Sequence, residues 1–480
     1  MKGIAWTLFG CLFAPLAASA QAEPKKPNIV IILCDDLGYG DLGCYGHPKI
    51  RTPNLDKLAQ QGVRFTQCYA AAPVCSPSRA GILTGRIPSR TGIYSWITES
   101  NPMHLQRQEI TLAALLKGAG YRTAQIGKWH LNGFFNSKLQ TQPGDHGFDH
   151  WFSTQNNAIP SHQDPKNFVR NGKAVGPMQG FSCQLVADEA IAWLKTGRDS
   201  PAPFFLHLCF HEPHEPVASP ANLVKSYAQA INDDQAQYFA NVTNMDLAVG
   251  RLLAALKEFG QADNTVVFFT SDNGPETLNR YPGARRSYGV VGALRGRKLW
   301  LYEGGIRVPG ILYWPGKTRP GQTSDEPLWS LDLLPTFGRA VGAKVPTDRA
   351  IDGSDFLPAL EGKKIERKTP LFWHYYRSLG EPRVALRDGD WVILARCDPS
   401  VKSAGGTLLK GDMEVIKKAK LTTFELYNLR DDLSQTKDLA QKEPERLQQM
   451  SDRLATLYRA VIAEGPTWMV PDVAPKKKKD

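Results

Sequence analysis

Residues Cys75–Arg86 read CSPSRAGILTGR, in which a cysteine, a proline and an arginine at alternate positions lead into an apolar segment. Pro77 suits the first turn of a helix because proline has no N–H group to leave unpaired there, and Gly85 suits the end of the segment. The pattern predicts a helix that begins near Cys75. Its free N–H groups, its dipole and the Arg79 side chain would then favour an anion beside residue 75.

This pattern alone leaves other interpretations of Cys75 open. A cysteine beside a helix can be a buried structural residue, because free cysteine is among the most buried residue types. A helix N-terminus can also lower the pKa of a thiol and make it reactive. The choice between these and an anion-binding site depends on the rest of the chain.

The chain around this segment alternates short apolar runs with segments of helical periodicity. Asn28–Leu33, NIVIIL, is a β-branched apolar run typical of a strand that is covered on both faces. Further strands are predicted at 63–69, 121–126, 204–208 and 265–270, and helices within 52–62 and at 111–117, 185–195 and 237–259. Such alternation indicates an α/β fold with a large, mostly parallel sheet flanked by helices.

Four of the predicted strands are followed at once by polar side chains. These are Asp35 and Asp36, Lys128 and His130, His211 and His214, and Asp272 and Asn273. Each pair alone also fits a solvated turn or a packed histidine, but ligands of open α/β sheets bind beyond the carboxyl ends of the strands. The acidic clusters offer only oxygen donors, which select Ca²⁺ or Mg²⁺ over zinc. We therefore expect a cation site and an anion site at one edge of the sheet.

The sequence changes in character beyond about Lys368. Short strand-like runs at 371–376, 384–387, 390–394 and 424–427 precede an amphipathic segment at 443–463, which predicts a small antiparallel sheet with one helix. We expect an α/β domain at 24–367, a C-terminal α+β subdomain at 368–470 and a basic disordered tail at 471–480. The segment Pro309–Gly321 is expected to form a surface loop around a strand.

Residues 1–22 have the pattern of a cleaved secretory signal peptide, with a lysine at position 2, an apolar run at 4–16 and small residues before the cleavage site. They predict a periplasmic or secreted protein without a stable membrane anchor, because the apolar run is too short to span a bilayer. The chain carries a formal net charge of +11, part of it in the lysines 476–479. No aromatic residues separate those lysines, so nucleic acid is not an expected partner, whereas positive charge suits an anionic substrate.

The segment Cys75–Arg86 resembles the full signature of the formylglycine-dependent (type I) sulfatases. In that family a formylglycine-generating or maturase enzyme oxidises the cysteine to formylglycine (3-oxoalanine), and Cys75 is the matching position. The resemblance extends through motifs over most of residues 27–310. It implies an alkaline-phosphatase-like fold, a large mixed and mostly parallel sheet between helices with a small C-terminal antiparallel sheet and helix, and it makes 24–367 the catalytic domain.

The two acidic motifs resemble the metal-binding elements of the same family, in which the metal is usually calcium. The resemblance implies a Ca²⁺ site, with Mg²⁺ as the less favoured ion. Its implied ligands are Asp35, Asp36, Cys75, Asp272 and Asn273. Carboxylates that converge without a partner repel one another, and a divalent cation removes that repulsion.

The motifs GKWHL and HEPHEP, together with a lysine five residues before a glutamate, match the remaining catalytic elements of the family. The catalytic residues that the resemblance implies are Cys75, Arg79, Lys128, His130, His214 and Lys298. Those implied to bind the sulfate group are Lys128, His214 and Lys298.

The family mechanism implies that one hydroxyl of a hydrated formylglycine at position 75 attacks sulfur, with Asp272 as the base, and that the alcohol leaves. The second hydroxyl then loses its proton towards His130, which expels sulfate and regenerates the aldehyde. Arg79 would hold the nucleophile in place. The departing alkoxide would be protonated by one of two residues, His214 or Lys298.

The substrate is indicated by fewer features. Arginines crowd the approach to Lys298, and two of them, Arg295 and Arg297, are predicted substrate contacts. Loop residues that could line a sugar-sized cleft are Trp96, Trp151, His162 and Trp300. We expect a sulfated carbohydrate as substrate, with small aryl sulfates as the alternative. A phosphate or phosphonate monoester hydrolase of the same superfold and a catalytically silent glycan-binding relative are further alternatives.

Overall fold

The computed structural model of the protein describes residues 3, 25–197, 201–401 and 406–470. The predicted signal peptide, apart from one residue, and the predicted C-terminal tail lie outside these ranges. Among the described residues, no helix combines the length and the apolar character that a membrane span requires.

Eleven of the described strands form one large mixed sheet in the order β10-β2-β9-β8-β1-β7-β3-β4-β5-β6, with β11 paired to β2. The four central strands β8, β1, β7 and β3 run parallel, whereas β9 runs antiparallel to both of its neighbours. The strands are β1 Asn28–Asp35, β2 Val63–Tyr69, β3 Arg122–Lys128, β4 His150–Thr154, β5 Val169–Arg170, β6 Lys173–Ala174, β7 Phe204–Pro213, β8 Thr265–Ser271, β9 Arg307–Tyr313, β10 Gln322–Ser324 and β11 Leu328–Trp329.

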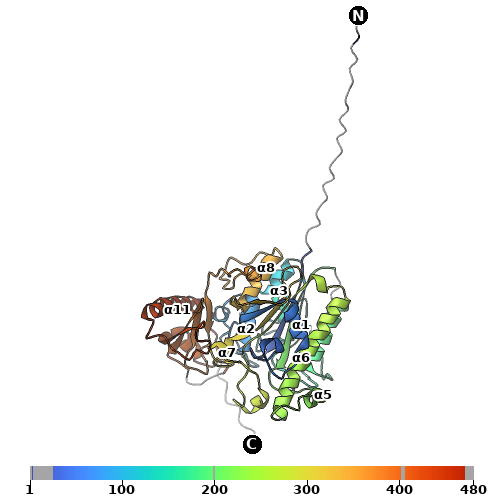
Figure 1. Cartoon of the computed structure of the whole chain (residues 1–480), viewed down its shortest axis with the longest axis horizontal. Coiled ribbons are helices and arrows are strands. Elements are labelled where there is room, and N and C mark those ends of the chain that lie inside the picture. Colours follow the sequence, from blue (N-terminus) through green and yellow to red (C-terminus); the bar gives the residue numbers. More distant parts are fainter. Residues whose placement is uncertain (1–2, 4–24, 198–200, 402–405, 471–480) are drawn as a thin grey trace.

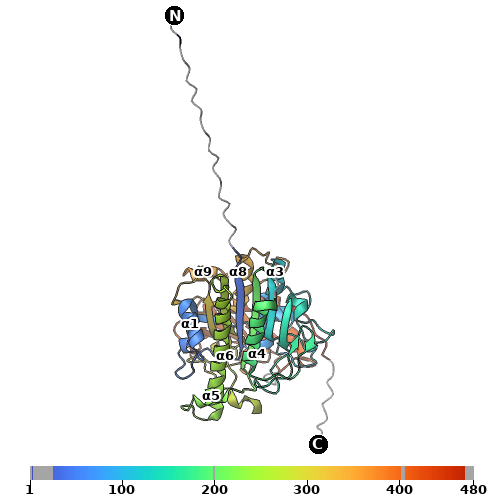
Figure 2. The same cartoon turned by 90° about the vertical axis from the view of Figure 1, so that its right-hand side faces the viewer.

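Helices cover both faces of this sheet (Figures 1 and 2). Alternate residues of β1 belong to two separate hydrophobic clusters, Ile29 and Ile31 to one and Val30 and Ile32 to the other, as a strand covered on both faces requires. One face packs against α1 Pro53–Gln61, α4 Ser182–Ala192 and α6 Asp233–Glu258. The other packs against α2 Cys75–Thr84, α3 Leu112–Gly118 and α8 Leu333–Ala340. Shorter helices are α5 Ala221–Lys225, α7 Glu303–Ile306 and α9 Leu357–Leu360.

A second, antiparallel sheet lies at one side of the molecule, in the orange and red part of Figure 1. Its strands are β12 Leu371–His374, β13 Val384–Asp388, β14 Trp391–Asp398 and β15 Lys420–Asn428, in that order, with α10 Asp412–Lys418 and α11 Pro444–Glu464 beside them. The apolar side chains of this sheet belong to the same cluster as those of α2 and α8. The indole N–H of Trp373 also donates to the carbonyl oxygen of Ala70, at 2.8 Å. The two sheets thus share one core.

The predicted fold class is confirmed, and most predicted elements are present within a few residues of their expected ends. The surface loop predicted to begin at Pro309 is wrong for residues 309–313, which lie in the buried strand β9 between β2 and β8. A bulge in β2 between Phe65 and Cys68 interrupts the pairing opposite Pro309, so the missing N–H group of the proline breaks no ladder bond there. The carbonyl oxygen of Pro309 accepts a hydrogen bond from Thr270 Oγ1.

Candidate active site

The polar residues that follow the four central strands lie together at one edge of the sheet. Because β8, β1, β7 and β3 are neighbours and parallel, their carboxyl ends meet there. These ends carry Asp272 and Asn273, Asp35 and Asp36, His211 and His214, and Lys128 and His130. The convergence expected from the sequence is therefore present.

The helix predicted at Cys75 is α2, and Cys75 is its first residue. The preceding Val74 is extended and provides no side-chain cap, and Gly85 ends the helix in the left-handed conformation with φ of 66°. Arg79, one turn into the helix, is almost completely buried. Its Nε donates to Asp272 Oδ2 at 2.9 Å and its Nη1 to the carbonyl oxygen of Lys128 at 3.0 Å. Arg79 therefore ties α2 to the ends of β8 and β3.

Each of the two neighbouring aspartates after β1 is paired with a buried lysine. Lys128 Nζ lies 2.5 Å from Asp35 Oδ2, and Lys298 Nζ lies 2.7 Å from Asp36 Oδ2. Asp36 has a φ of 63°, which is rare for a residue with a side chain and costs free energy that the surrounding contacts must offset. The pairs hold both lysines in place, close to the first turn of α2.

Two carboxyl groups of this cluster have pKa values shifted in opposite directions, although burial favours the protonated form of both. Burial alone would raise the pKa of Asp35, but the charges of Lys128, His214 and Arg79 outweigh it and hold that pKa well below its usual range. Burial, reinforced by the charge of Asp35, raises the pKa of Asp272 to about 7. Arg79, Lys128 and Lys298 pair with the three carboxyl groups of the cluster, but the raised pKa of Asp272 shows that burial and the charge of Asp35 outweigh its arginine partner.

The oxygen atoms of the cluster fit a hard divalent cation. Within the described residues, the buried atoms Asp35 Oδ1 and Asn273 Oδ1 have no hydrogen-bond partner. Asn273 donates through Nδ2 to Asp36 Oδ1 at 2.7 Å, which turns its own Oδ1 away from that bond. Asp35, Asp36 and His214 place ligand atoms within 4.8 Å of one another. Because nearly all these donors are oxygens, Ca²⁺ and Mg²⁺ fit the site better than zinc does.

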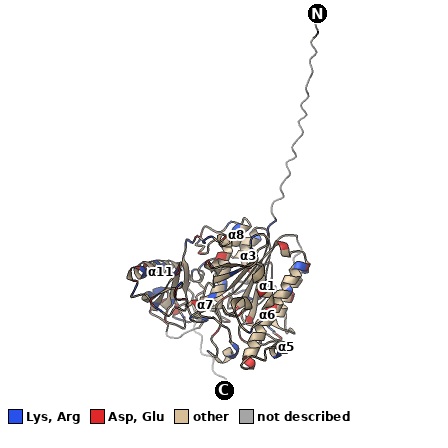
Figure 3. Ribbon diagram, viewed as in Figure 1, with Lys and Arg blue, Asp and Glu red and all other residues tan. Residues whose placement is uncertain are grey.

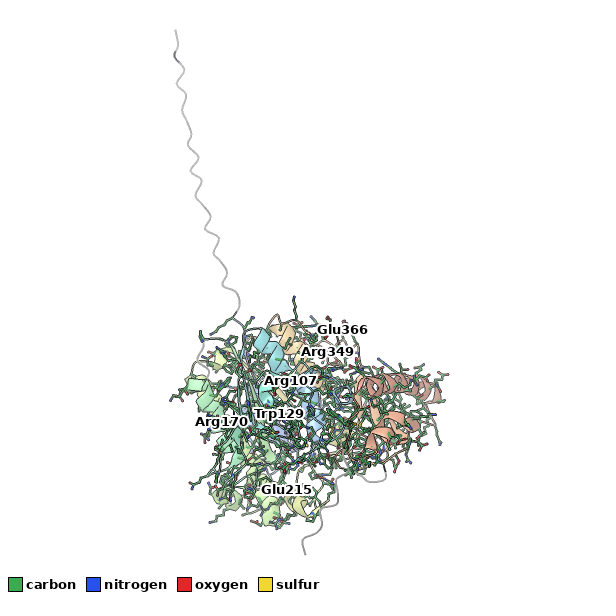
Figure 4. All side chains as sticks on the ribbon, turned by 180° about the vertical axis from the view of Figure 1, so that it is seen from behind. Arg107, Trp129, Arg170, Glu215, Arg349 and Glu366 are labelled. Carbon is green, nitrogen blue, oxygen red and sulfur yellow. The ribbon has the colours of Figure 1, made fainter. Side chains whose placement is uncertain are left out.

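The two histidines of the cluster are held in defined orientations. His130, with a φ of 57°, donates from Nε2 to the carbonyl oxygen of Ile97 at 2.9 Å, so its buried Nδ1, which has no partner in the part of the chain that the structure describes, is the proton acceptor of the neutral ring. His214 donates from Nδ1 to its neighbour's carbonyl oxygen, and its Nε2 lies 3.6 Å from Asp36. Burial and nearby cations lower the pKa of both rings. The buried Trp129, labelled in Figure 4, fixes the segment that carries His130.

A cavity of about 310 Å³ opens onto these groups. It is lined by Val74, Cys75, Trp96, His130, Asn156, His214, Glu276, Arg280, Tyr281 and Lys298. Burial raises the pKa of the Cys75 thiol to about 11, although the charges of Lys128 and Lys298 oppose the shift. The first turn of α2 therefore meets a compact pocket that holds several cationic or hydrogen-bonding groups and suits an anion.

Arg295 and Arg297, predicted as substrate contacts, do not line this cavity, so that prediction has no support. Arg295 Nη1 donates to the carbonyl oxygen of Gln435, and its guanidinium lies 3.8 Å from the ring centroid of Tyr302. Arg297 donates to the carbonyl oxygens of Glu276 and Gly289. Both side chains hold backbone segments together instead.

Of the aromatic and histidine candidates for a sugar cleft, only Trp96 lines the cavity. Trp151 packs against Phe135, and His162 is buried beside Asn241. The cavity instead contains Asn156, Glu276 and Tyr281, which the sequence did not indicate. They lie in loops without a recognisable motif, and only the tertiary fold brings them to the site.

A parallel sheet with an anion-binding helix terminus and a carboxylate cluster at its carboxyl edge defines an α/β protein built to bind a charged ligand. The sequence profile of the sulfatase family matches residues 27–343, and the chain belongs to this family. It is a sulfuric ester hydrolase, as its curated relatives are.

Three relatives illustrate the breadth of this similarity. Steryl-sulfatase from Rattus norvegicus is 35% identical over 452 residues, which cover 77% of each chain. N-acetylgalactosamine-6-sulfatase from Sus scrofa is 38% identical over 379 residues, or 74% of this chain and 69% of the relative. Arylsulfatase A from Bos taurus is 34% identical over 504 residues, or 97% and 93%.

Among solved structures, Ps i-CgsB in complex with k-i-k-neocarrahexaose matches with a TM-score of 0.78 at 27% identity, covering 93% of this chain and 96% of that one. PsFucS1 sulfatase from Pseudoalteromonas sp. matches with a TM-score of 0.74 at 26% identity, covering 93% and 92%. Both matches include the small C-terminal sheet as well as the large one, because they extend over more than nine tenths of this chain.

Proposed function

We propose that this sulfatase hydrolyses sulfate monoesters of carbohydrates, with a formylglycine made from Cys75 and a bound Ca²⁺. The observation that carries the proposal is the single cavity in which Cys75, His130, His214 and Lys298 meet beside the acidic cluster. The ion would be held by Asp35, Asp36, Asp272, Asn273 and residue 75. An exported protein could meet such substrates outside the cytoplasm, and the signal peptide proposed at 1–22 fits that role.

The state of Cys75 supports an oxidised nucleophile. With its pKa raised to about 11, the thiol is almost entirely protonated at neutral pH and is a poor nucleophile. A buried structural cysteine would not need to line a polar cavity next to two lysines. A formylglycine-generating or maturase enzyme acting before folding is therefore part of the proposal.

Once hydrated, formylglycine supplies a pair of hydroxyl groups on one carbon, and a bound Ca²⁺ supplies positive charge that stabilises developing oxyanions. Residues of the chain bind the sulfate group and transfer the protons. Lys298, Lys128 and His214 bind the sulfate oxygens and compensate the charge that spreads over them in the transition state. Arg79 fixes Asp272, which accepts the first proton.

Two further proton transfers fall to groups whose geometry suits them. His130 presents its unprotonated Nδ1 and accepts the second proton from residue 75. The leaving alkoxide receives a proton from His214 or from Lys298, whose pKa its acidic neighbours raise well above the usual value despite burial. Lys298 thus remains charged while it binds sulfate.

Carbohydrates are proposed as substrates because the matches include a complex with a carrahexaose and an enzyme named for N-acetylgalactosamine 6-sulfate. Aryl sulfates are the second candidate. They are favoured by the similarity to arylsulfatase A, which extends over 97% of the chain.

The proposal is tested by measuring kcat/KM on a panel of sulfated monosaccharides, on 4-nitrophenyl sulfate and on the matching phosphate esters. We expect the sulfate esters to react at least about 100-fold faster than the phosphate esters, with a sulfated sugar as the best substrate. Cys75→Ala should abolish turnover while the circular dichroism spectrum stays unchanged. Faster hydrolysis of the phosphate esters, or full activity of Cys75→Ala, would contradict the proposal.

A further inference from the structure

Part of the cavity wall consists of residues that no catalytic motif contains. These are Trp96, Asn156, Glu276, Arg280 and Tyr281. They lie in the same cavity as the residues proposed to bind sulfate, so they face the organic part of a sulfate ester. Their chemistry therefore bears on which alcohol the enzyme accepts.

The most polar of these groups is a fixed ion pair. Arg280 donates from Nε to Glu276 Oε1 at 2.8 Å and from Nη2 to Oε2 at 2.7 Å. The side chain of Glu276 is 3% exposed and that of Arg280 is 27% exposed. The guanidinium also lies 5.0 Å from the ring centroid of Tyr281. Two parallel hydrogen bonds and an aromatic neighbour fix the plane of the guanidinium, whereas Nη1 has no hydrogen-bond partner within the described residues.

The loop that carries this pair is held at both ends by the catalytic framework. At its start, Arg297 Nη2 donates to the carbonyl oxygen of Glu276 at 3.1 Å. The backbone N–H of Lys298 donates to the carbonyl oxygen of Pro275 at 3.0 Å. At its other end, the backbone N–H of Arg286 donates to Glu215 Oε1 at 2.8 Å. Glu215, labelled in Figure 4, is the neighbour of His214. The pair therefore keeps a constant position relative to the sulfate-binding residues.

The charges of this wall favour a neutral ligand over a second anion. The Glu276–Arg280 pair has no net charge, so a second sulfate or a carboxylate placed there would meet repulsion from Glu276 along with attraction to Arg280. Asn156 adds a buried Oδ1 that has no hydrogen-bond partner in the described part of the chain and can only accept. An anion cannot donate to that oxygen, whereas a hydroxyl group can both donate to Asn156 and accept from Arg280.

We propose that Arg280, fixed by Glu276, and Asn156 form a subsite for the hydroxyl groups of an electrically neutral sugar ring that carries the sulfate. The partly buried indole of Trp96 supplies an apolar surface for the C–H face of the ring. The inference rests on the proposed function and specifies its substrate class, a neutral sulfated sugar in place of a sulfated uronic acid or a ring with a second sulfate. Arg280 is then a residue that determines specificity.

The test compares Arg280→Ala with the wild type on a neutral monosulfated sugar and on 4-nitrophenyl sulfate, which has no ring hydroxyl groups. We expect kcat/KM for the sugar to fall about 50-fold, mainly through KM, and that for the aryl sulfate to fall less than about 5-fold. The matched control is Arg285→Ala, an arginine of the same loop whose side chain is 63% exposed and does not line the cavity. The control should keep the wild-type ratio between the two substrates.

Equal losses on both substrates, or no loss on the sugar, would overturn the subsite alone, whereas a wild type that accepts only aryl sulfates would overturn both the subsite and the carbohydrate substrate of the proposed function. In each case the sulfatase activity itself would stand. A wild type that hydrolyses sulfate esters no faster than phosphate esters would instead show that the proposed function is wrong.

A second variant tests the preference for a neutral ring. The wild type should hydrolyse the neutral monosulfated sugar in preference to a sulfated uronic acid of the same sulfate position. Glu276→Gln removes the repulsive charge, so it should raise the relative kcat/KM for the uronic acid at least about 5-fold. A wild type that prefers the uronic acid, or a Glu276→Gln variant with an unchanged ratio, would contradict the assignment.

Discussion

Asp35 and Asp272 show how the same burial leads to different protonation at two carboxyl groups. Lys128 stabilises the anionic form of Asp35 at 2.5 Å, whereas Asp272 shares Arg79 with its neighbours and has a pKa raised to about 7. Lys128 and Arg79 offset only part of the repulsion between these two groups, and among the described residues Asp35 Oδ1 and Asn273 Oδ1 still lack a hydrogen-bond partner, so a bound cation would stabilise the cluster further.

We predict that Ca²⁺ stabilises the folded protein through these carboxylates. After exhaustive chelation, the midpoint of thermal unfolding should fall by about 5 °C or more and should recover when Ca²⁺ is added, because the ion binds the native state alone. Asp272→Asn should lose this response, and Asp263→Asn, at an exposed acidic residue, should keep it. A midpoint that is the same with chelator and with Ca²⁺ would disprove the metal assignment.

Two single residues of the site have an unusual backbone conformation. Asp36 and His130 both have positive φ, at 63° and 57°. Both follow a central strand, where the chain must turn sharply to point a side chain at the cavity. Strain of this kind, of order 1–3 kcal/mol per residue, is typical of functional sites. The sequence indicated the chemistry of both residues but not their conformation, which depends on contacts far away in the chain.

At the scale of elements, the strand β3 approaches β7 closely just before Lys128. Gly127 has a φ of 102°, and a Cβ atom there would lie 1.8 Å from the carbonyl oxygen of Cys209. Only glycine therefore allows β3 to deliver Lys128 and His130 at this distance from β7.

Gly127→Ala should lower the free energy of unfolding by about 3 kcal/mol or more, because the two backbones must separate and the alanine must adopt positive φ. Gly118→Ala at the end of α3 is the control, since its Cβ would meet nothing within 4 Å. Urea unfolding of both variants measures the difference. If the two variants are equally stable, the close approach of β3 and β7 does not require glycine.

The elements that the sequence predicted are those with a strong and regular pattern. β1 and β8 are largely apolar runs, β7 is apolar up to Phe210 apart from His207, and α6 repeats apolar residues at helical spacing. β5 and β6 have two residues each, and β5 pairs with β4 while β6 pairs with β5, so no local pattern could reveal them. The sequence predicts a strand within 309–321, but as part of a surface loop, because proline normally marks the edge of a sheet, and only the bulge in β2 allows Pro309 inside β9.

In the whole molecule, side-chain contacts as well as the shared core attach the C-terminal sheet to the large sheet. Glu464 in α11 forms ion pairs with Arg86 and Arg90, which follow α2. His374 of β12 bonds Ser89 Oγ at 2.9 Å through its Nδ1. These contacts add to the apolar core that the two sheets share, whereas charged residues of both signs are interspersed over the ribbon in Figure 3.

Stability should fall at acidic pH because of His374. Burial, with a smaller effect of Arg383, lowers the pKa of His374 to about 3 in the folded protein, against about 6.5 when unfolded. The unfolded state therefore binds a proton that the folded state does not between these values. The contribution is complete above pH 6.5 and is lost as the pH falls towards 3, up to on the order of 4 kcal/mol.

His374→Phe should flatten this dependence while it keeps an aromatic ring against Tyr458. Losing the bond to Ser89 lowers stability by an amount that does not depend on pH, so the slopes are compared and not the absolute values. Unfolding free energies measured by urea at several pH values from about 4.5 to about 6.5, within the range where the shift acts, give both slopes. Parallel curves for the two proteins would show that His374 does not titrate as described.

Only part of the candidate site could be predicted from the sequence, because local motifs do not determine where distant loops lie. Its catalytic half comes from short motifs at the ends of parallel strands, and the sheet topology brings these together whatever the loops do. The other half, with Asn156, Glu276 and Arg280, comes from loops whose positions depend on bonds such as that from Arg286 to Glu215. Arg295 and Arg297 are much closer to Lys298 in sequence than Arg280 is, but contacts that no local pattern reveals direct them elsewhere.

The proposed mechanism depends most directly on the chemical state of residue 75. Protein produced together with a formylglycine-generating or maturase enzyme can be digested with trypsin. The mass of the peptide 65–79 and of its fragments can then be measured by mass spectrometry. We predict that this peptide is about 18 Da lighter than its unmodified form, with the loss located at residue 75 and not at Cys68, and that specific activity rises in proportion to the modified fraction. Full activity in a preparation whose peptide carries only the unmodified Cys75 would contradict the account.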